Sequence, residues 1–127
     1  MAKRGKEPRP KRPIEPVVEY IAREAARRYG PIEPDLPGKV RRNVKRGFGS
    51  DLSTEEVRTL LLHYKEIYAF AASILRNNRE YWEQDFVRSG DAAWQRFVGL
   101  LVEKYHRERR AILDMVAKCA SYYELLS

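Results

Sequence analysis

The sequence predicts an all-α protein, with an N-terminal basic arm containing short helices followed by a three- or four-helix antiparallel bundle. Apolar residues recur at intervals of three and four along residues 53–127, and no stretch shows the alternation of a strand. All seven prolines lie in the first 37 residues. Residues 1–50 hold 14 Lys and Arg against 6 Asp and Glu, whereas residues 51–127 hold 11 against 12. We therefore expect a basic, proline-rich arm over residues 1–50 and a helical bundle over residues 51–127 that folds without it.

Within the arm, residues 1–13 (MAKRGKEPRPKRP) lack the apolar side chains of a core and predict an extended segment that becomes ordered on a partner. A proline at its start and a Gly-Pro pair at its end predict a helix over residues 16–29. Residues 31–38 (PIEPDLPG) indicate a linker. Residues 39–47 predict a short helix that is basic on nearly every side, and residues 47–50 (GFGS) predict a hinge.

The bundle is predicted to begin at a capping box, with Ser53 as N-cap and Glu56 at the third helical position. A long apolar stripe then indicates one helix that ends near Asn77-Asn78, and a shorter helix follows over residues 79–88. A third helical pattern runs from Ala92 to the end of the chain. The polar cluster at residues 106–110 fits either a solvated stretch of one long helix or a turn.

The inventory of reactive side chains argues against an enzyme, a metal site or a cofactor. His63 and His106 have no Cys, Asp or Glu at a recognised ligand spacing, and no phosphate-binding glycine loop occurs. The single cysteine, Cys119, lies in an apolar helical run and is expected to be a core residue. No stretch approaches the length of a membrane span and no signal peptide is present, so we expect a soluble protein made inside the cell.

The basic residues of the arm predict contact with a polyanion. A solubility tail is the alternative, but such a tail does not need the apolar stripes of residues 16–29 and 39–47. Because few aromatic residues lie among these basic side chains, we expect them to bind nucleic-acid phosphates, largely independently of sequence. The candidate residues are Lys3, Arg4, Lys6, Arg9, Lys11, Arg12, Arg23, Arg27, Arg28, Lys39, Arg41, Arg42, Lys45 and Arg46.

The basic arm MAKRGKEPRPKRP, the basic helix KVRRNVKRG and the helical body that follows resemble in layout the major capsid proteins of rod-shaped and filamentous viruses of hyperthermophilic archaea. The resemblance implies that the arm wraps double-stranded DNA, held in the A form, while the bundles pack outward along a helical filament in the virion. It also implies association with further copies or with a paralogous capsid subunit. Arg outnumbers Lys by 17 to 8, a bias that fits a thermophile.

Two other functions stay open at this stage. One is a cellular DNA-binding or chromatin-associated protein of a thermophilic archaeon, and the other is an interaction module whose arm binds an acidic protein or ribosomal RNA. The adjacent aromatic pairs Tyr81-Trp82 and Tyr122-Tyr123 fit either core packing or an assembly surface, because neighbouring residues on a helix point about 100° apart.

Overall fold

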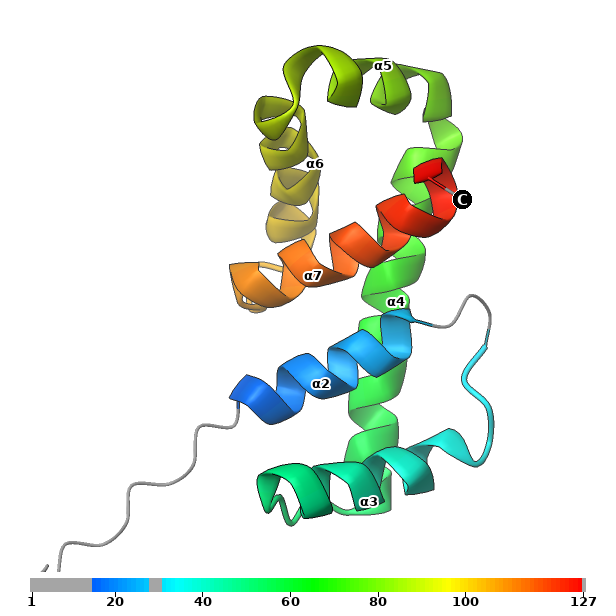
Figure 1. The fold of residues 1–127 in the computed structure, drawn as a ribbon, viewed down its shortest axis with the longest axis vertical. Helices are drawn as coiled ribbons and strands as arrows, with labels where there is room; N and C mark the ends of the chain where they lie inside the picture. Colours follow the sequence, from blue (N-terminus) through cyan, green and yellow to red (C-terminus); the bar gives the residue numbers. More distant parts are fainter. Residues whose placement is uncertain (1–14, 28–30, 127) are drawn as a thin grey trace, which may run out of the picture.

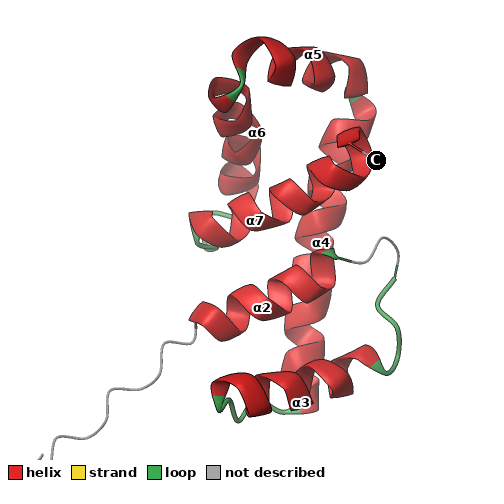
Figure 2. Cartoon of the chain, viewed as in Figure 1, coloured by secondary structure: helices red, strands yellow, loops and turns green. Residues whose placement is uncertain are grey.

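A computed structural model describes residues 15–27 and 31–126 (Figure 1). These residues form helices joined by short loops, and no strand occurs among them (Figure 2). The all-α prediction is therefore confirmed. The helices are α2 (Glu15–Ala26), α3 (Leu36–Phe48), α4 (Thr54–Asn77), α5 (Arg79–Ser89), α6 (Asp91–Lys104) and α7 (Arg110–Ser121), followed by the π-helix η1 (Tyr122–Leu126).

Helix α4 is the central element of the fold, and α3, α2 and α7 cross it one above the other (Figure 1). Helix α5 turns the chain at the end of α4, and α6 returns toward α7. The structure is thus a bundle of six described helices, three of which cross α4 instead of running antiparallel to it. The lengths explain this arrangement, because α4 has 24 residues whereas α2, α3 and α7 have 12 or 13. At 1.5 Å per residue α4 is about 36 Å long, and a helix that crosses it covers only its own width of about 10 Å, so several are needed to bury its apolar face.

One hydrophobic core includes residues from both sides of the expected boundary at residue 50. Helix α2 buries Ile21 and α3 buries Val44, both in the same cluster as Leu61 of α4. From Glu15 onward, packing is therefore continuous across residue 50, and the division into an arm of residues 1–50 and a bundle of residues 51–127 stays a prediction. The apolar stripes noted in residues 16–29 and 39–47 are the reason, since they cover α4. Residues 1–14 lie outside the described residues.

The second basic helix begins earlier than predicted. Leu36 and Pro37 belong to the first turn of α3, although the sequence indicated a linker up to residue 38. Proline is accepted there because the first N–H groups of a helix have no intrahelical partner. The helix ends at Gly49, whose φ of 66° lies in the left-handed region that favours glycine. The expected hinge covered residues 47–50. Its first two residues, Gly47 and Phe48, belong to α3, and only Gly49 and the loop after it are non-helical.

Helix α4 begins at the predicted capping box. The Ser53 side chain accepts a hydrogen bond from the Glu56 backbone N–H at 3.1 Å, and the Ser53 N–H donates to the Glu56 carboxylate at 2.9 Å. This reciprocal pair satisfies two backbone groups at the helix start. The predicted end near Asn77-Asn78 is also confirmed.

An aromatic cluster holds α5 against α6. The ring of Phe97 lies 5.4 Å from Trp82, 6.1 Å from Phe86 and 5.7 Å from Trp94, measured between centroids. These packed rings position the turn at the far end of α4. Helix α6 then ends at Lys104 and α7 begins at Arg110, so residues 106–109 of the polar cluster belong to a turn and Arg110 is the first residue of α7.

Candidate nucleic-acid interface

Helix α3 presents its basic residues to solvent, four of them exposed and Arg41 half-buried. Val40 and Val44 are fully buried, and Leu36 continues their stripe toward the start of the helix. At roughly 100° per residue, the basic positions of α3 occupy the arc on the other side of the helix. We call this set the α3 basic face. Its members are Lys39, Arg41, Arg42, Lys45 and Arg46.

The α3 basic face is part of a packed helix. Beside the buried valines, the Asn43 side-chain amide donates a hydrogen bond to the Tyr20 hydroxyl of α2 at 3.0 Å. The Tyr20 ring also lies 5.7 Å from the ring of Phe48, between centroids. These contacts fix α3 against α2 and α4, so its basic side chains project from a folded surface.

The charge of this face is poorly balanced by carboxylates. Elsewhere in the described chain, basic side chains often form ion pairs, such as Arg79 with Glu83 at 2.6 Å, Arg96 with Asp85 at 2.7 Å and Lys118 with Asp114 at 3.1 Å. On α3, Lys39 lies 3.0 Å from Asp35. Within residues 15–27 and 31–126, the other four members lie within ion-pair distance of no carboxylate.

Like charges also repeat along α3. Arg41 and Lys45 are four residues apart, as are Arg42 and Arg46, while Lys39 and Arg42 are three apart. Each such neighbouring pair of like charges destabilises a helix by about 0.2–0.5 kcal/mol. An anion bound across the face would remove this repulsion, so the arrangement favours a polyanionic ligand.

The structure separates Arg23 and Arg27 of α2 from the α3 basic face. The Arg27 guanidinium lies 2.7 Å from the Glu24 carboxylate, and the Arg27 carbonyl accepts a hydrogen bond from the Tyr123 hydroxyl of η1 at 2.6 Å. Arg23 acts on the Cys119 thiol of α7. Burial raises the pKa of this thiol, and the charge of Arg23 opposes that increase. The neighbours of these two arginines thus belong to α2, α7 and η1. The remaining predicted residues, which lie outside the described part, are Lys3, Arg4, Lys6, Arg9, Lys11, Arg12 and Arg28.

The turn between α6 and α7 adds basic residues that the sequence prediction did not include. Arg107, Arg109 and Arg110 are exposed there, and Arg109 forms an ion pair with Glu15 at the start of α2. This contact places the turn beside the point where the basic N-terminal segment enters the fold. The run HRERR over residues 106–110 was the available signal, but its position next to α2 depends on the tertiary fold.

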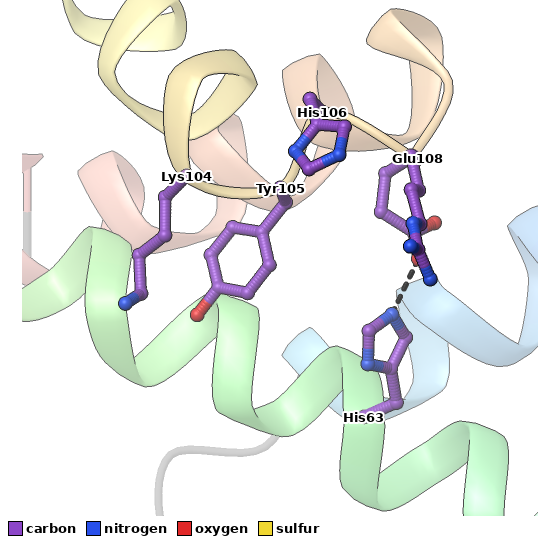
Figure 3. Close-up of a pocket in the computed structure, with 6 residues that line it drawn as sticks. His63, Lys104, Tyr105, His106 and Glu108 are labelled. Carbon is purple, nitrogen blue, oxygen red and sulfur yellow. Dashed lines mark hydrogen bonds and ion pairs between the residues drawn. The ribbon is translucent and has the colours of Figure 1, made fainter.

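A cavity of about 200 Å³ lies under the same turn (Figure 3). Helix α4 contributes His63, whose Nε2 atom is hydrogen bonded to the Glu108 carboxylate of the turn. The Tyr64 hydroxyl donates to the same carboxylate at 3.0 Å. Burial, followed by the charge of Glu108, raises the pKa of Tyr64. The sequence showed no acidic residue at a ligand spacing from His63, and the fold supplies Glu108 from 45 positions away.

The described side chains form no group of three or more His, Cys, Asp and Glu suited to hold a metal ion. In the part of the chain that the structure covers, no helix combines the length and apolar character that crossing a membrane requires. Comparison of the chain with protein-family models, curated proteins and solved structures gives no match. Function must therefore be inferred from the residues and their arrangement.

Proposed function

We propose that this protein binds double-stranded DNA without base specificity and packages it as the structural subunit of a helical nucleocapsid. The α3 basic face is the observation that supports DNA binding. Four of its side chains lack a described carboxylate partner, and guanidinium and ammonium groups form charge-assisted hydrogen bonds with phosphates. The basic segment of residues 1–14, which enters the fold at α2, would supply further phosphate contacts.

The chemistry of the face favours phosphates over base edges. Amide side chains read adenine by pairing with its edge in the major groove. The amide of α3 belongs to Asn43, and its nitrogen donates to Tyr20 within the protein. The remaining Arg and Lys side chains form charge-assisted hydrogen bonds with phosphates in any sequence, and we therefore expect binding to depend little on sequence.

The same face favours a duplex over a single strand. Proteins that bind single strands stack the bases on exposed aromatic rings. The aromatic residue of α3, Phe48, is half-buried against the core and packs on Tyr20. A helix of 13 residues is about 20 Å long, and that length of duplex presents about twelve phosphates. The phosphates along that length therefore outnumber the five members of the α3 basic face.

Packaging in a filament is supported by the layout of the chain, in which a basic segment precedes a helical body. A cellular DNA-coating protein is the second candidate. The packing of α2 and α3 into the core favours it, because these helices form a fixed surface and only residues 1–14 are left to act as a wrapping arm.

DNA binding is tested by fluorescence anisotropy with a labelled linear duplex. We expect Arg42→Glu combined with Arg46→Glu to weaken binding by more than tenfold while the far-UV circular dichroism stays unchanged, because both side chains point away from the core. The control is Arg58→Glu with Arg79→Glu, which makes the same charge change at solvent-accessible helical positions on α4 and α5, where each variant also loses one surface ion pair. If the α3 variant binds as tightly as this control, the α3 basic face is not the DNA-binding surface.

Electron microscopy of the protein with linear duplex separates the two candidates. Filaments of constant diameter with a regular helical repeat are expected for a nucleocapsid subunit. Irregular coating or bridging of the DNA would favour the cellular protein, and preferential competition by ribosomal RNA would contradict both.

A further inference from the structure

Helix α5 lies at the opposite end of the long axis of the molecule from α3 (Figure 1). Its inner side is buried at Trp82 and Asp85, whereas its outer side exposes two large apolar residues. The Tyr81 side chain is 54% exposed and Val87 is 89% exposed. Apolar side chains exposed together on one short helix are candidates for contact with another protein.

Five exposed residues of α5, which lie to one side of the ion-paired Arg79 and Glu83, have a symmetric order in the sequence. Glu80 and Arg88 lie four residues before and after Gln84, and Tyr81 and Val87 lie three residues before and after it. At 3.6 residues per turn, these five positions occupy about one third of the helix circumference. We call them the α5 outer face.

We propose that two copies of this chain pair through their α5 outer faces, with the helices antiparallel and a twofold axis at Gln84. This arrangement places each Glu80 at the height of the partner's Arg88, and each Tyr81 at the height of the partner's Val87. Both pairs occur twice, as a twofold interface requires.

The charged groups that this pairing joins are available in the single chain. Among the described residues, Arg88 forms no ion pair. Glu80 accepts one long hydrogen bond, from the Gln84 side chain at 3.5 Å. Charge complementarity therefore favours a second copy of this chain over an unrelated partner. The interface is small, since a pair of helices of 11 residues each buries less than the roughly 1,200 Å² of stable interfaces, so we expect a reversible, weak dimer.

The position of α5 gives the dimer a function that rests on the proposed DNA binding. Because α3 and α5 lie at opposite ends of the molecule, pairing through α5 would place the two α3 helices far apart in the dimer (Figure 1). Each face would then contact a separate duplex segment. The dimer is thus expected to bridge DNA, while the monomer binds without bridging.

Sedimentation velocity of the full chain across a concentration series, without DNA, tests the pairing. We expect Glu80→Arg and Arg88→Glu each to weaken the dimer by about tenfold or more, because each places like charges opposite one another twice. The double variant Glu80→Arg with Arg88→Glu should restore dimerisation. Residues 80 and 88 are about 12 Å apart along one helix, so this rescue can arise only between chains. Glu103→Arg, an exposed charge change on α6, is the control and should dimerise as the unaltered chain does.

A chain that stays monomeric at about 1 mM, or a double variant no more dimeric than the single variants, would overturn the pairing. If a single variant loses its helical circular dichroism signal, Arg88→Gln is tested in its place. This substitution removes the charge without introducing repulsion, so it should weaken the dimer less than Arg88→Glu. Since self-association is measured without DNA, its failure is distinguishable from failure of the proposed function. DNA binding without dimers refutes only this inference, and dimers without DNA binding refute only the proposed function.

Discussion

The clearest structural prediction concerns two truncated chains, one lacking residues 1–14 and one lacking residues 1–50. The first keeps every described helix, so we expect it to retain cooperative unfolding. The second loses α2 and α3, which together bury eight apolar residues. These are Val17, Ile21, Ala22, Ala25, Ala26, Leu36, Val40 and Val44.

The size of the effect follows from these side chains. The five larger ones each stabilise the fold by about 1.5–3 kcal/mol through burial, or about 7–15 kcal/mol together. A domain of this kind is stable by only about 5–15 kcal/mol in total. Removing α2 and α3 also exposes part of the apolar face of α4, since both helices pack against α4 in the intact chain. We therefore expect the chain lacking residues 1–50 to be unfolded or aggregated.

Circular dichroism at 222 nm during thermal unfolding is the measurement. The chain lacking residues 1–14 should melt in a single cooperative transition close to that of the full chain. The other chain should show low helicity and no transition. If it melts cooperatively with the helical content of α4 to α7, residues 51–127 fold without α2 and α3. The reasoning from buried side chains would then be refuted.

Three further outcomes are expected. Replacing Arg42 and Arg46 with Gln should reduce the slope of log affinity against log salt by about 1.8, because each lost phosphate contact removes about 0.9. In the same anisotropy assay, Arg58→Gln with Arg79→Gln should leave the slope unchanged. Ser53→Ala should lower the free energy of unfolding by about 1 kcal/mol in urea titrations, because it removes the α4 cap; an effect near zero would mean that the capping box is not formed in solution. The raised pKa of Tyr64 means that the phenol ionises more readily in the unfolded chain, so its stabilising contribution is complete below about pH 10 and is lost as the pH rises above that value. Tyr64→Phe should therefore reduce the loss of stability between pH 9 and 11 relative to the unaltered chain; equal slopes for the variant and the unaltered chain would contradict this assignment.

The elements of the fold were accessible from local patterns. The capping box at Ser53 and the long apolar stripe after it predicted α4 from start to end, because helix initiation and helical periodicity depend on residues within a few positions of one another. The adjacent pair Tyr81-Trp82 likewise indicated one exposed and one buried side chain, and Tyr81 is exposed while Trp82 is buried. The concentration of basic residues in α3 was visible for the same reason.

The boundary between arm and bundle was not accessible in this way. Charge and proline content change near residue 50, but the core forms wherever apolar stripes meet, and those of α2 and α3 meet α4.

What the sequence determined by itself is therefore the helical class, most helix limits and the basic character of α3, all of which follow from short-range chemistry. The tertiary structure alone decided which neighbours each helix has. It joined Glu108 to His63 across 45 positions, placed the turn at residues 106–110 beside Glu15, and separated Arg23 and Arg27 from the α3 basic face. Such contacts depend on how helices cross when their apolar faces are buried together, and no local pattern in the chain specifies that geometry.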